Sequence, residues 1–306
     1  MNWKLRPAYL ATVVVAVLSI VACGSSPTPP APASKGTITI AGFAFSEGTV
    51  LMQLYGQALA HAGFTVNYKP NLGSREVVGP AIKTGQIDLY IGYAATDLEY
   101  FDNKAGLATG DPTATTAKLN TFLQPLNLAA LTPSSAQDQN GFAMTQANAT
   151  KYNATKLSDL APIGNQLILG AGPECPTRPF CQLGLKNTYG ITFKSFKALD
   201  TDGPLTRAAL KNNDIQVGLV FTSDADLQSL NLVVLQDDKH LQNADNVVPI
   251  IRTAVATADA KKVLNAVSAG LNTTDLIALN AQVEIQHQDA DVATKAYLQQ
   301  HNWFGS

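Results

Sequence analysis

The chain has few of the residues that mark catalytic, metal-binding or nucleic-acid-binding proteins. It contains only three cysteines and four histidines, and charged residues make up 14% of it. No basic run with interleaved aromatics occurs, so the sequence does not predict nucleic-acid binding. The histidines show no ligand spacing, so no metal site is expected, and nothing in the sequence implies a cofactor.

Familiar catalytic signatures are also missing. G-x-S-x-G, H-E-x-x-H, G-x-x-x-x-G-K-[ST] and G-x-G-x-x-G do not occur. Nothing therefore signals a nucleophile with its base, and we expect that the protein is not an enzyme. The alternative is a secreted enzyme that uses Ser46 or Ser74 with His61. His61 falls late in a predicted helix, which places it away from the expected cleft.

No apolar run in the N-terminal segment is long enough to span a membrane. Lys4 and Arg6 precede an apolar run from Ala8 to Ala22. This run is shorter than the roughly 20 residues of a spanning helix and has the length of a signal-peptide core. A small residue before Cys23 resembles the lipobox of bacterial lipoproteins, which implies a signal peptide over residues 1–22 and lipidation of Cys23. Ordinary secretion, with Cys23 lost or free, is the alternative.

The segment after this cysteine predicts a flexible tether. Residues 23–35 are rich in proline, serine and alanine, which bury too little surface to fold. The folded part is expected to begin near Gly36. Together these features predict a protein held by a lipid anchor alone on the outer face of the bacterial cytoplasmic membrane.

The two remaining cysteines form a candidate disulfide. Cys175 and Cys181 lie six residues apart in ECPTRPFC. Outside the cytoplasmic membrane such a pair is expected to be oxidised. The flanking prolines favour a turn that brings the two sulfurs together. We therefore predict a Cys175–Cys181 disulfide.

The first 60 residues of the expected folded part alternate between strand and helix patterns. Strands are predicted at Thr37–Ala41, Phe64–Tyr68 and Ile87–Ile91, and helices begin with Ser46 and Ser74 as N-caps. This β-α-β-α-β order implies a parallel sheet with right-handed crossovers.

One helix-to-strand unit is echoed 128 residues later. Ala81-Ile82-Lys83 with Ile87-Asp88-Leu89 matches Ala209-Leu210-Lys211 with Ile215-Gln216-Val217 in the same register. Two similar units suggest two similar lobes with a cleft between them. Chance similarity of two ordinary units is the alternative.

The rest of the chain predicts a second α/β series followed by a return to the first lobe. The predicted elements are strands at Gly141–Met144, Leu167–Gly170, Ile215–Phe221 and Leu232–Leu235, a helix from Gly203-Pro204, a returning strand at Val247–Ile251, and helices from Thr257 with breaks near Asn272 and Gln288. We therefore expect an α/β protein in which residues 36–139 and 246–306 form lobe 1 and residues 140–245 form lobe 2.

A series of segments resembles the substrate-binding proteins of ABC importers for glycine betaine, choline and related osmolytes, the ProX/OpuC type. In chain order these are FAFSE from Phe43, LGSREVV, GQIDLYIGY, SDLAP, GLKNTYG, DGPLTRAAL, FTSDA and VVLQDD. The resemblance implies a two-lobe periplasmic-binding-protein fold of class II with a ligand cleft between the lobes. It also implies a monomer that serves osmoprotection by delivering a small zwitterion or quaternary amine to ABC permease subunits.

The resemblance further implies a set of ligand-binding residues. Family members hold a quaternary ammonium against aromatic faces, and they bind a ligand carboxylate through an arginine. Matched by position, Tyr93, Phe142 and Phe221 belong to the aromatic box, and Arg178 is the carboxylate-binding arginine. The full predicted site consists of Phe43, Ser46, Tyr93, Asn140, Phe142, Arg178, Phe221 and Thr222.

Several positions depart from the family pattern. Gly92 replaces a usual glutamate, Phe142 and Phe221 stand where tyrosine is frequent, and no aromatic lies near Asn246. Fewer hydroxyl donors are therefore available in the box. These departures leave open a receptor of the same fold for a different small ligand, such as an aromatic or polyol compound.

Overall fold

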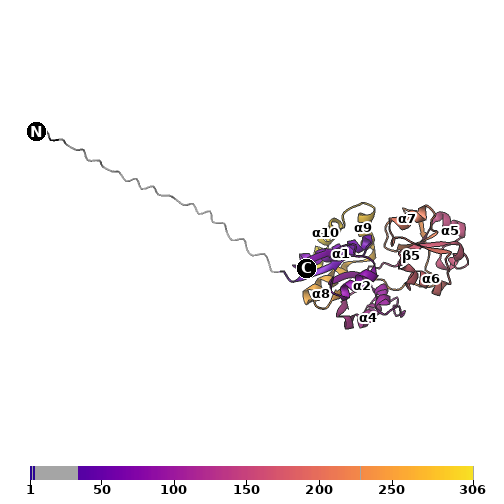
Figure 1. The fold of residues 1–306 in the computed structure, drawn as a ribbon, viewed down its shortest axis with the longest axis horizontal. Helices are drawn as coiled ribbons and strands as arrows, with labels where there is room; N and C mark the ends of the chain where they lie inside the picture. Colours follow the sequence, from indigo (N-terminus) through magenta and orange to yellow (C-terminus); the bar gives the residue numbers. More distant parts are fainter. Residues whose placement is uncertain (2, 4–33, 228, 306) are drawn as a thin grey trace. The chain divides into compact units, whose positions relative to one another are not determined.

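The computed structural model describes residues 1, 3, 34–227 and 229–305. The folded structure belongs to the compact unit Ser34–Ser306 (Figure 1). The predicted lipidation site Cys23, and the signal peptide apart from residues 1 and 3, lie outside the described residues. Within the described part, no helix combines the length and apolar character needed to cross a membrane.

The first sheet combines strands from both ends of the folded chain. Its order is β2-β1-β3-β10-β4, with β1 at Thr37–Ala41, β2 at Thr65–Lys69, β3 at Leu89–Tyr93, β4 at Leu128–Ala130 and β10 at Val247–Arg252. Strand β1 pairs in parallel with β2 and β3, which confirms the predicted β-α-β-α-β arrangement. The returning strand β10 is antiparallel to both β3 and β4.

In the described part of the chain, seven α-helices pack around this sheet, and we call the sheet and these helices lobe 1. They are α1 (Ser46–His61), α2 (Arg75–Lys83), α3 (Ala94–Phe101), α4 (Pro112–Leu123), α8 (Ala258–Gly270), α9 (Thr273–Glu284) and α10 (Ala290–Gln300). The predicted breaks near Asn272 and Gln288 separate α8, α9 and α10. Helix α1 contacts all three of these C-terminal helices. The early and late parts of the chain, indigo and yellow in Figure 1, therefore share one hydrophobic core.

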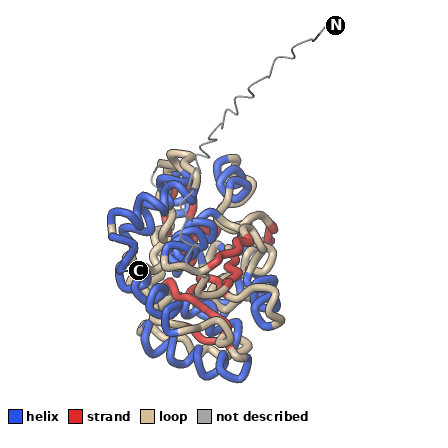
Figure 2. Tube along the Cα trace, turned by 90° about the vertical axis from the view of Figure 1, so that its left-hand side faces the viewer, coloured by secondary structure: helices blue, strands red, loops and turns tan. Residues whose placement is uncertain are grey.

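The second sheet is built from the middle of the chain. Its order is β7-β6-β8-β5-β9, with β5 at Asn140–Thr145, β6 at Ile168–Ala171, β7 at Ser195–Ala198, β8 at Val217–Phe221 and β9 at Leu232–Val234. Strand β6 is parallel to β7 and β8, while β5 is antiparallel to β8 and β9. Helices α5 (Gln146–Tyr152), α6 (Gln182–Tyr189) and α7 (Pro204–Lys211) pack with it as lobe 2. In Figure 2 the strands (red) lie inside and the helices (blue) surround them.

The echoed units occupy equivalent places in the two lobes. Helix α2 leads into β3, and α7 leads into β8. In both units one helical carbonyl closes the turn, because Ala81 O accepts from the amides of Gln86 and Ile87 while Ala209 O accepts from those of Asp214 and Ile215. The internal similarity in the sequence thus corresponds to one supersecondary unit used once in each lobe.

Two chain segments connect the lobes and run side by side. One lies between β4 and β5 and the other between β9 and β10. Gln137 and Asn246 form an antiparallel bridge, and the Asp138 amide donates to the Asp245 carbonyl at 3.0 Å. A hinge made of two adjacent segments joins the lobes at the floor of the site described next.

Candidate functional site

A small cavity lies between the lobes and is lined by both of them. Its volume is about 80 Å³, which admits only a small solute. The lining residues are Phe43, Ala44, Phe45, Gly73, Ser74, Arg75, Tyr93 and Thr96 from lobe 1, Asp138 and Asp245 from the hinge, and Asn140, Glu174, Arg178, Thr201 and Phe221 from lobe 2. Most of them follow the carboxyl ends of strands, where α/β sheets bind ligands.

Four aromatic side chains form one wall of the cavity. Phe43 and Phe45 follow β1, Tyr93 ends β3, and Phe221 ends β8. The Phe45 ring centroid lies 5.7 Å from that of Phe43 and 6.4 Å from that of Tyr93. Across the lobes, the Phe45 and Phe221 centroids are 5.0 Å apart. We call these four residues the aromatic box.

The loop after β1 packs tightly against the first turn of α1. A Cβ atom on Gly48 would lie 2.8 Å from the Phe43 carbonyl oxygen, so only glycine allows this approach. Phe45, with an extended backbone, is the N-cap residue of α1, and the predicted N-cap Ser46 is the first helical residue instead. The tight loop therefore turns two phenylalanines toward the cavity.

The end of β3 is held by a buried polar network. Asp97 accepts from the Tyr93 amide at 2.8 Å and from the Tyr90 hydroxyl at 2.9 Å. A Cβ atom on Gly92 would lie 2.0 Å from an Asp97 carboxylate oxygen. The absence of the usual glutamate at Gly92 therefore has a steric reason, since the Asp97 carboxylate occupies that space.

Arg75 also lines the cavity and was missed as a site residue. Its Nε donates to Asp97 at 2.6 Å, and its guanidinium lies 5.1 Å from the Phe43 ring centroid. The side chain is only 6% exposed. The signal was available, because Arg75 belongs to the LGSREVV segment that carries part of the family resemblance.

The hydroxyl of Tyr93 reaches a buried carboxyl behind the box. It donates to Glu47 at 2.5 Å, and the Asn280 amide donates to the other oxygen of Glu47 at 2.7 Å. Burial raises the pKa of Glu47 above its ordinary value, although these hydrogen bonds oppose the rise. The Tyr93 ring is therefore fixed in orientation, with its hydroxyl directed away from the cavity.

Two hinge carboxyls form the floor of the cavity. Asp245 accepts from the Thr96 amide at 2.7 Å and from the Thr96 hydroxyl at 2.6 Å. Burial raises the pKa of Asp245 to about 6. Burial, with the nearby Glu47, raises the pKa of Asp138 well above its usual range. Because burial is the main cause of both shifts, a bound cation would stabilise the ionised forms.

Arg178 lies at the edge of the cavity, in the loop between Cys175 and Cys181. The structure contains the disulfide between these cysteines. The Arg178 guanidinium donates to Glu76 of lobe 1, from Nε at 3.2 Å and from Nη2 at 2.8 Å. Its Nη1 lies 3.7 Å from a carboxylate oxygen of Glu174. The arginine predicted to bind a ligand carboxylate is thus engaged by two carboxylates of the protein.

Phe142, predicted to belong to the box, lies away from the cavity in this structure. Phe142 does not line the cavity, is 1% exposed and packs in the core of lobe 2 with both disulfide cysteines. It lies on the same face of β5 as Asn140, two residues further from the cavity, where the disulfide loop covers the sheet. Asn140 lines the cavity and donates to the Phe180 carbonyl at 3.0 Å.

Two further predicted residues lie beside the cavity. The Thr222 hydroxyl accepts from the Gln139 amide at 2.8 Å, and the Thr222 amide donates to the Gln139 carbonyl at 3.0 Å. Thr222 therefore ties β8 to the hinge. Ser46 lines a smaller neighbouring cavity, together with Asp202, Asp224 and Glu284.

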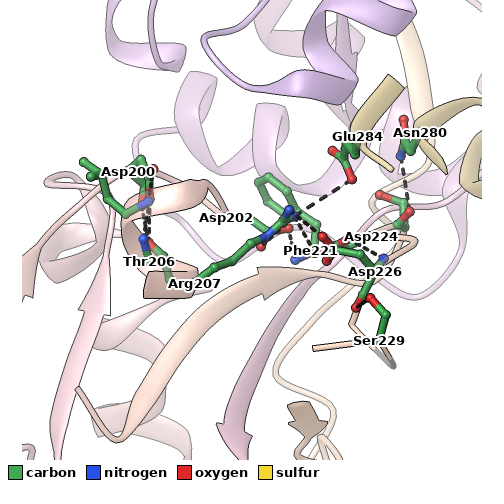
Figure 3. A network of polar contacts seen from close by, with 12 residues as sticks. Asp200, Asp202, Thr206, Arg207, Phe221, Asp224, Asp226, Ser229, Asn280 and Glu284 are labelled. Atoms are coloured by element: carbon green, nitrogen blue, oxygen red, sulfur yellow. Dashed lines mark hydrogen bonds and ion pairs between the residues drawn. The ribbon is translucent and has the colours of Figure 1, made fainter. Parts of the chain in front are cut away.

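Beyond Phe221, one arginine meets four carboxylates (Figure 3). The guanidinium of Arg207, on α7, is close to a carboxylate oxygen of each. Nη2 lies 2.8 Å from Asp224 and Nη1 lies 2.8 Å from Asp226. Nη2 also lies 3.8 Å from Asp202 and 3.9 Å from Glu284. Glu284 ends α9 in lobe 1, whereas the other residues belong to lobe 2. We call Arg207 and these carboxylates the acidic cluster. This cluster forms a second contact between the lobes, in addition to the Arg178–Glu76 pair, and it was not predicted from the sequence.

The excess of carboxylates has an electrostatic consequence. Burial and the Asp224 charge raise the pKa of Glu284 to about 7 and that of Asp226 to about 6. The same two causes raise the pKa of Asp202 well above its usual range.

Among the residues that the structure describes, no three or more histidine, cysteine or acidic side chains are placed to hold a metal ion.

Comparison with known proteins places the chain in a family. Residues 36–300 match the model of the substrate binding domain of ABC-type glycine betaine transport systems. The glycine-betaine-binding protein of Pseudomonas aeruginosa is 26% identical and aligns with 88% of this chain and 89% of its own length. The carnitine transport binding protein OpuCC of Listeria monocytogenes is 25% identical, with 89% of each protein covered.

Solved structures share the fold. A glycine betaine/carnitine/choline ABC transporter structure superposes with a TM-score of 0.65 at 20% identity and covers 87% of this chain and 99% of its own. A choline binding protein in complex with choline gives a TM-score of 0.63 at 15% identity, with 88% and 91% covered. The α/β two-lobe fold predicted from the sequence is confirmed. The chain belongs to the family of substrate-binding domains of ABC-type glycine betaine transport systems.

Proposed function

We propose that this protein binds a quaternary ammonium compound in its aromatic box and presents it to the permease subunits of an ABC importer. The box itself is the observation that carries this proposal. The nitrogen of a quaternary ammonium has neither a hydrogen to donate nor a lone pair to accept a hydrogen bond. The faces of aromatic rings attract such a cation electrostatically instead. Each well-placed ring contributes about 0.5–2 kcal/mol when the cation is desolvated.

The arrangement of the box across the lobes supports binding by closure of the hinge. Phe43, Phe45 and Tyr93 belong to lobe 1, and Phe221 belongs to lobe 2. A ligand between them contacts both lobes only when the lobes are close together. Binding then favours the closed arrangement, because the ligand interacts more strongly with it than with the open one.

The proposed ligand-contacting residues differ partly from those predicted. Phe43, Tyr93, Asn140, Arg178 and Phe221 remain in the proposal because they line the cavity, while Ser46 and Thr222 act beside it. Phe45 is added and Phe142 is removed. The proposed lobe limits remain residues 36–139 with 246–306 and residues 140–245, in agreement with the separate hydrophobic clusters of the two sheets.

The place of the protein in the cell is part of the same proposal. A lipid on Cys23 would hold the folded part at the outer face of the cytoplasmic membrane, beside the permease. The lipobox-like segment and the proline-rich stretch after it support this arrangement. A disulfide between Cys175 and Cys181 suits an oxidising compartment outside that membrane.

A second candidate ligand is a hydroxylated compound, such as a polyol. The carboxyls of Asp138 and Asp245, together with Asn140 and Thr201, also line the cavity. These groups can accept and donate hydrogen bonds to hydroxyls. A polyol would use these polar groups, whereas a quaternary ammonium would use the rings as well as the carboxylates.

Calorimetric titration of residues 34–306 with choline, glycine betaine and glycerol tests the proposal. We expect saturable one-to-one binding of at least one quaternary ammonium, and loss of about tenfold or more in affinity in Phe45→Ala. Tyr152→Ala is the matched control, because Tyr152 ends α5 outside the cavity. Binding of glycerol alone would favour the second candidate, and no binding of any quaternary ammonium by folded protein would refute the first.

A further inference from the structure

Glu76 occupies the guanidinium of Arg178, the group that the sequence predicts to bind a ligand carboxylate. Two guanidinium nitrogens of Arg178 donate to the two oxygens of Glu76, Nε to Oε1 at 3.2 Å and Nη2 to Oε2 at 2.8 Å. This two-point arrangement is the one that arginine forms with a carboxylate ligand. Arg178 belongs to lobe 2 and Glu76 to the first turn of α2 in lobe 1, so the pair also joins the lobes.

The Glu76 carboxylate is held in place from its own lobe. The Ser74 hydroxyl donates to Oε2 at 2.6 Å. Partial burial would raise the pKa of Glu76, but the hydrogen bonds and charge of Arg178 lower it to about 2. Glu76 is therefore ionised at physiological pH, and it neutralises Arg178 before any ligand arrives.

The other arginine of the cavity is also neutralised. Arg75 donates to Asp97 at 2.6 Å, and both side chains are nearly completely buried. The remaining charged residues that line the cavity are the carboxyl groups of Asp138, Glu174 and Asp245. Among the described residues, both arginines of the cavity are thus charge-paired with protein carboxylates, so a ligand carboxylate would meet no uncompensated cation but several acidic groups. A ligand cation would meet acidic groups and aromatic rings.

We propose that Glu76 determines specificity by substituting for the ligand's carboxylate, so that this receptor selects carboxylate-free quaternary ammonium cations over zwitterions. The inference rests on the proposed function of the aromatic box. Choline and glycine betaine are the matched probes, because they share a trimethylammonium group and differ in that only glycine betaine carries a carboxylate. Glu76 does not itself line the main cavity and acts through Arg178, whose guanidinium it pairs with and so withholds from a ligand carboxylate.

The test is calorimetric titration of both probes into the purified protein and into Glu76→Gln. We expect the unaltered protein to bind choline about tenfold more tightly than glycine betaine. In Glu76→Gln the arginine is free to bind a carboxylate, so the affinity for glycine betaine should rise about tenfold and the preference should be lost or reversed. Adding Arg178→Ala to Glu76→Gln should abolish this gain for glycine betaine.

Two controls accompany these variants. Asp214→Asn also neutralises one carboxylate of an ion pair, the one between Lys197 and Asp214, but that pair lies outside the cavity on lobe 2. It should leave the ratio of the two affinities unchanged. Glu76→Asp keeps the charge and should retain the preference for choline, and circular dichroism checks that each variant is folded.

The outcomes separate the inference from the proposed function. If the unaltered protein prefers glycine betaine, or if Glu76→Gln leaves the ratio of affinities unchanged, the role of Glu76 is refuted while the aromatic box stands. If neither probe binds to any folded form, the proposed function itself fails, and the inference fails with it.

Discussion

Among the residues that the structure describes, two ion-pair contacts join the lobes, and they differ in charge balance. At the first contact Arg178 meets Glu76, whose side chain is 46% exposed, with Glu174 nearby. At the second, Arg207 meets four carboxylates, of which Asp202, Asp224 and Glu284 are at most 13% exposed. Both contacts border the aromatic box, since Arg178 lines the main cavity and the acidic cluster lines its neighbour next to Phe45 and Phe221.

The difference shows that the number and burial of the carboxylates around an arginine determine how an ion-pair contact responds to pH. The first contact lowers the pKa of Glu76 to about 2, whereas burial and mutual repulsion at the second raise the pKa of Glu284 to about 7. The first contact is therefore lost in strong acid. The second is weakened as the pH rises and its carboxyls ionise. The arrangement of the two lobes thus depends on one contact that weakens in strong acid and on another that weakens as the pH rises.

Breaking the acidic cluster should have the largest effect. Arg207→Met keeps most of the side chain's bulk but leaves the carboxylates without their cation. We expect the free energy of unfolding in urea to fall by about 3 kcal/mol at pH 7.5. Lys211→Met, on an exposed position of the same helix, is the control and should change it little. An equal effect of the two variants would contradict the central role given to Arg207.

The pH dependence of stability should come next in size. The pKa values of Glu284 and Asp226 are raised in the folded protein to about 7 and about 6, so their protonated forms stabilise it. This contribution is full below their ordinary values near 4 and is lost as the pH rises through about 6 to 7. We expect the melting temperature to fall by about 3 °C, or about 1 kcal/mol, between pH 5.5 and pH 8. A melting temperature that rises over this interval would exclude the mechanism.

Neutralising one carboxylate should sharpen this result. Glu284→Gln removes the charge that lobe 1 contributes to the acidic cluster. The variant should have a higher melting temperature than the unaltered protein at pH 8, and about half of the fall between pH 5.5 and pH 8 should disappear. Glu174→Gln, at the other contact, serves as the comparison and should keep the whole pH dependence. The prediction fails if Glu284→Gln leaves the pH profile unaltered.

The smallest effect on stability is expected at the Glu76–Arg178 pair. Because Glu76 is 46% exposed, its pairing is screened by water, and Glu76→Gln should change the free energy of unfolding by less than about 1 kcal/mol. Its main effect should appear in the ratio of ligand affinities. Urea unfolding without ligand measures the first quantity, and a loss comparable to that of Arg207→Met would show that this pair is structural instead of selective.

Much of the fold could be predicted from local patterns. Apolar periodicity and turn residues placed β1, α1, α2 and the C-terminal helices, and the helix-to-strand echo predicted two similar lobes. These signals are local, because side chains repeat along a helix or strand at its own period. Short elements such as α3, α5 and β7 were missed. They hold too few residues for a period to be recognised.

Part of the site could also be predicted from local patterns. Phe43, Tyr93 and Phe221 were placed near strand ends by local pattern and by the family resemblance, and all three line the cavity. Phe142 lies in the core of lobe 2 instead, because the disulfide loop packs over that part of β5. Arg75 and Phe45 belong to segments that carry the family resemblance, which was an available signal, but the local pattern did not show that their side chains turn toward the cavity.

The sequence by itself determined the class of fold and the segments that approach the cleft, and it predicted the disulfide between Cys175 and Cys181 that the structure contains. Only the tertiary structure decided which charges meet there. Glu76 and Arg178 are 102 residues apart in the chain, and Arg207 and Glu284 belong to different lobes. Contacts of this kind depend on how two lobes with separate hydrophobic cores face each other, and no period within either segment encodes that geometry.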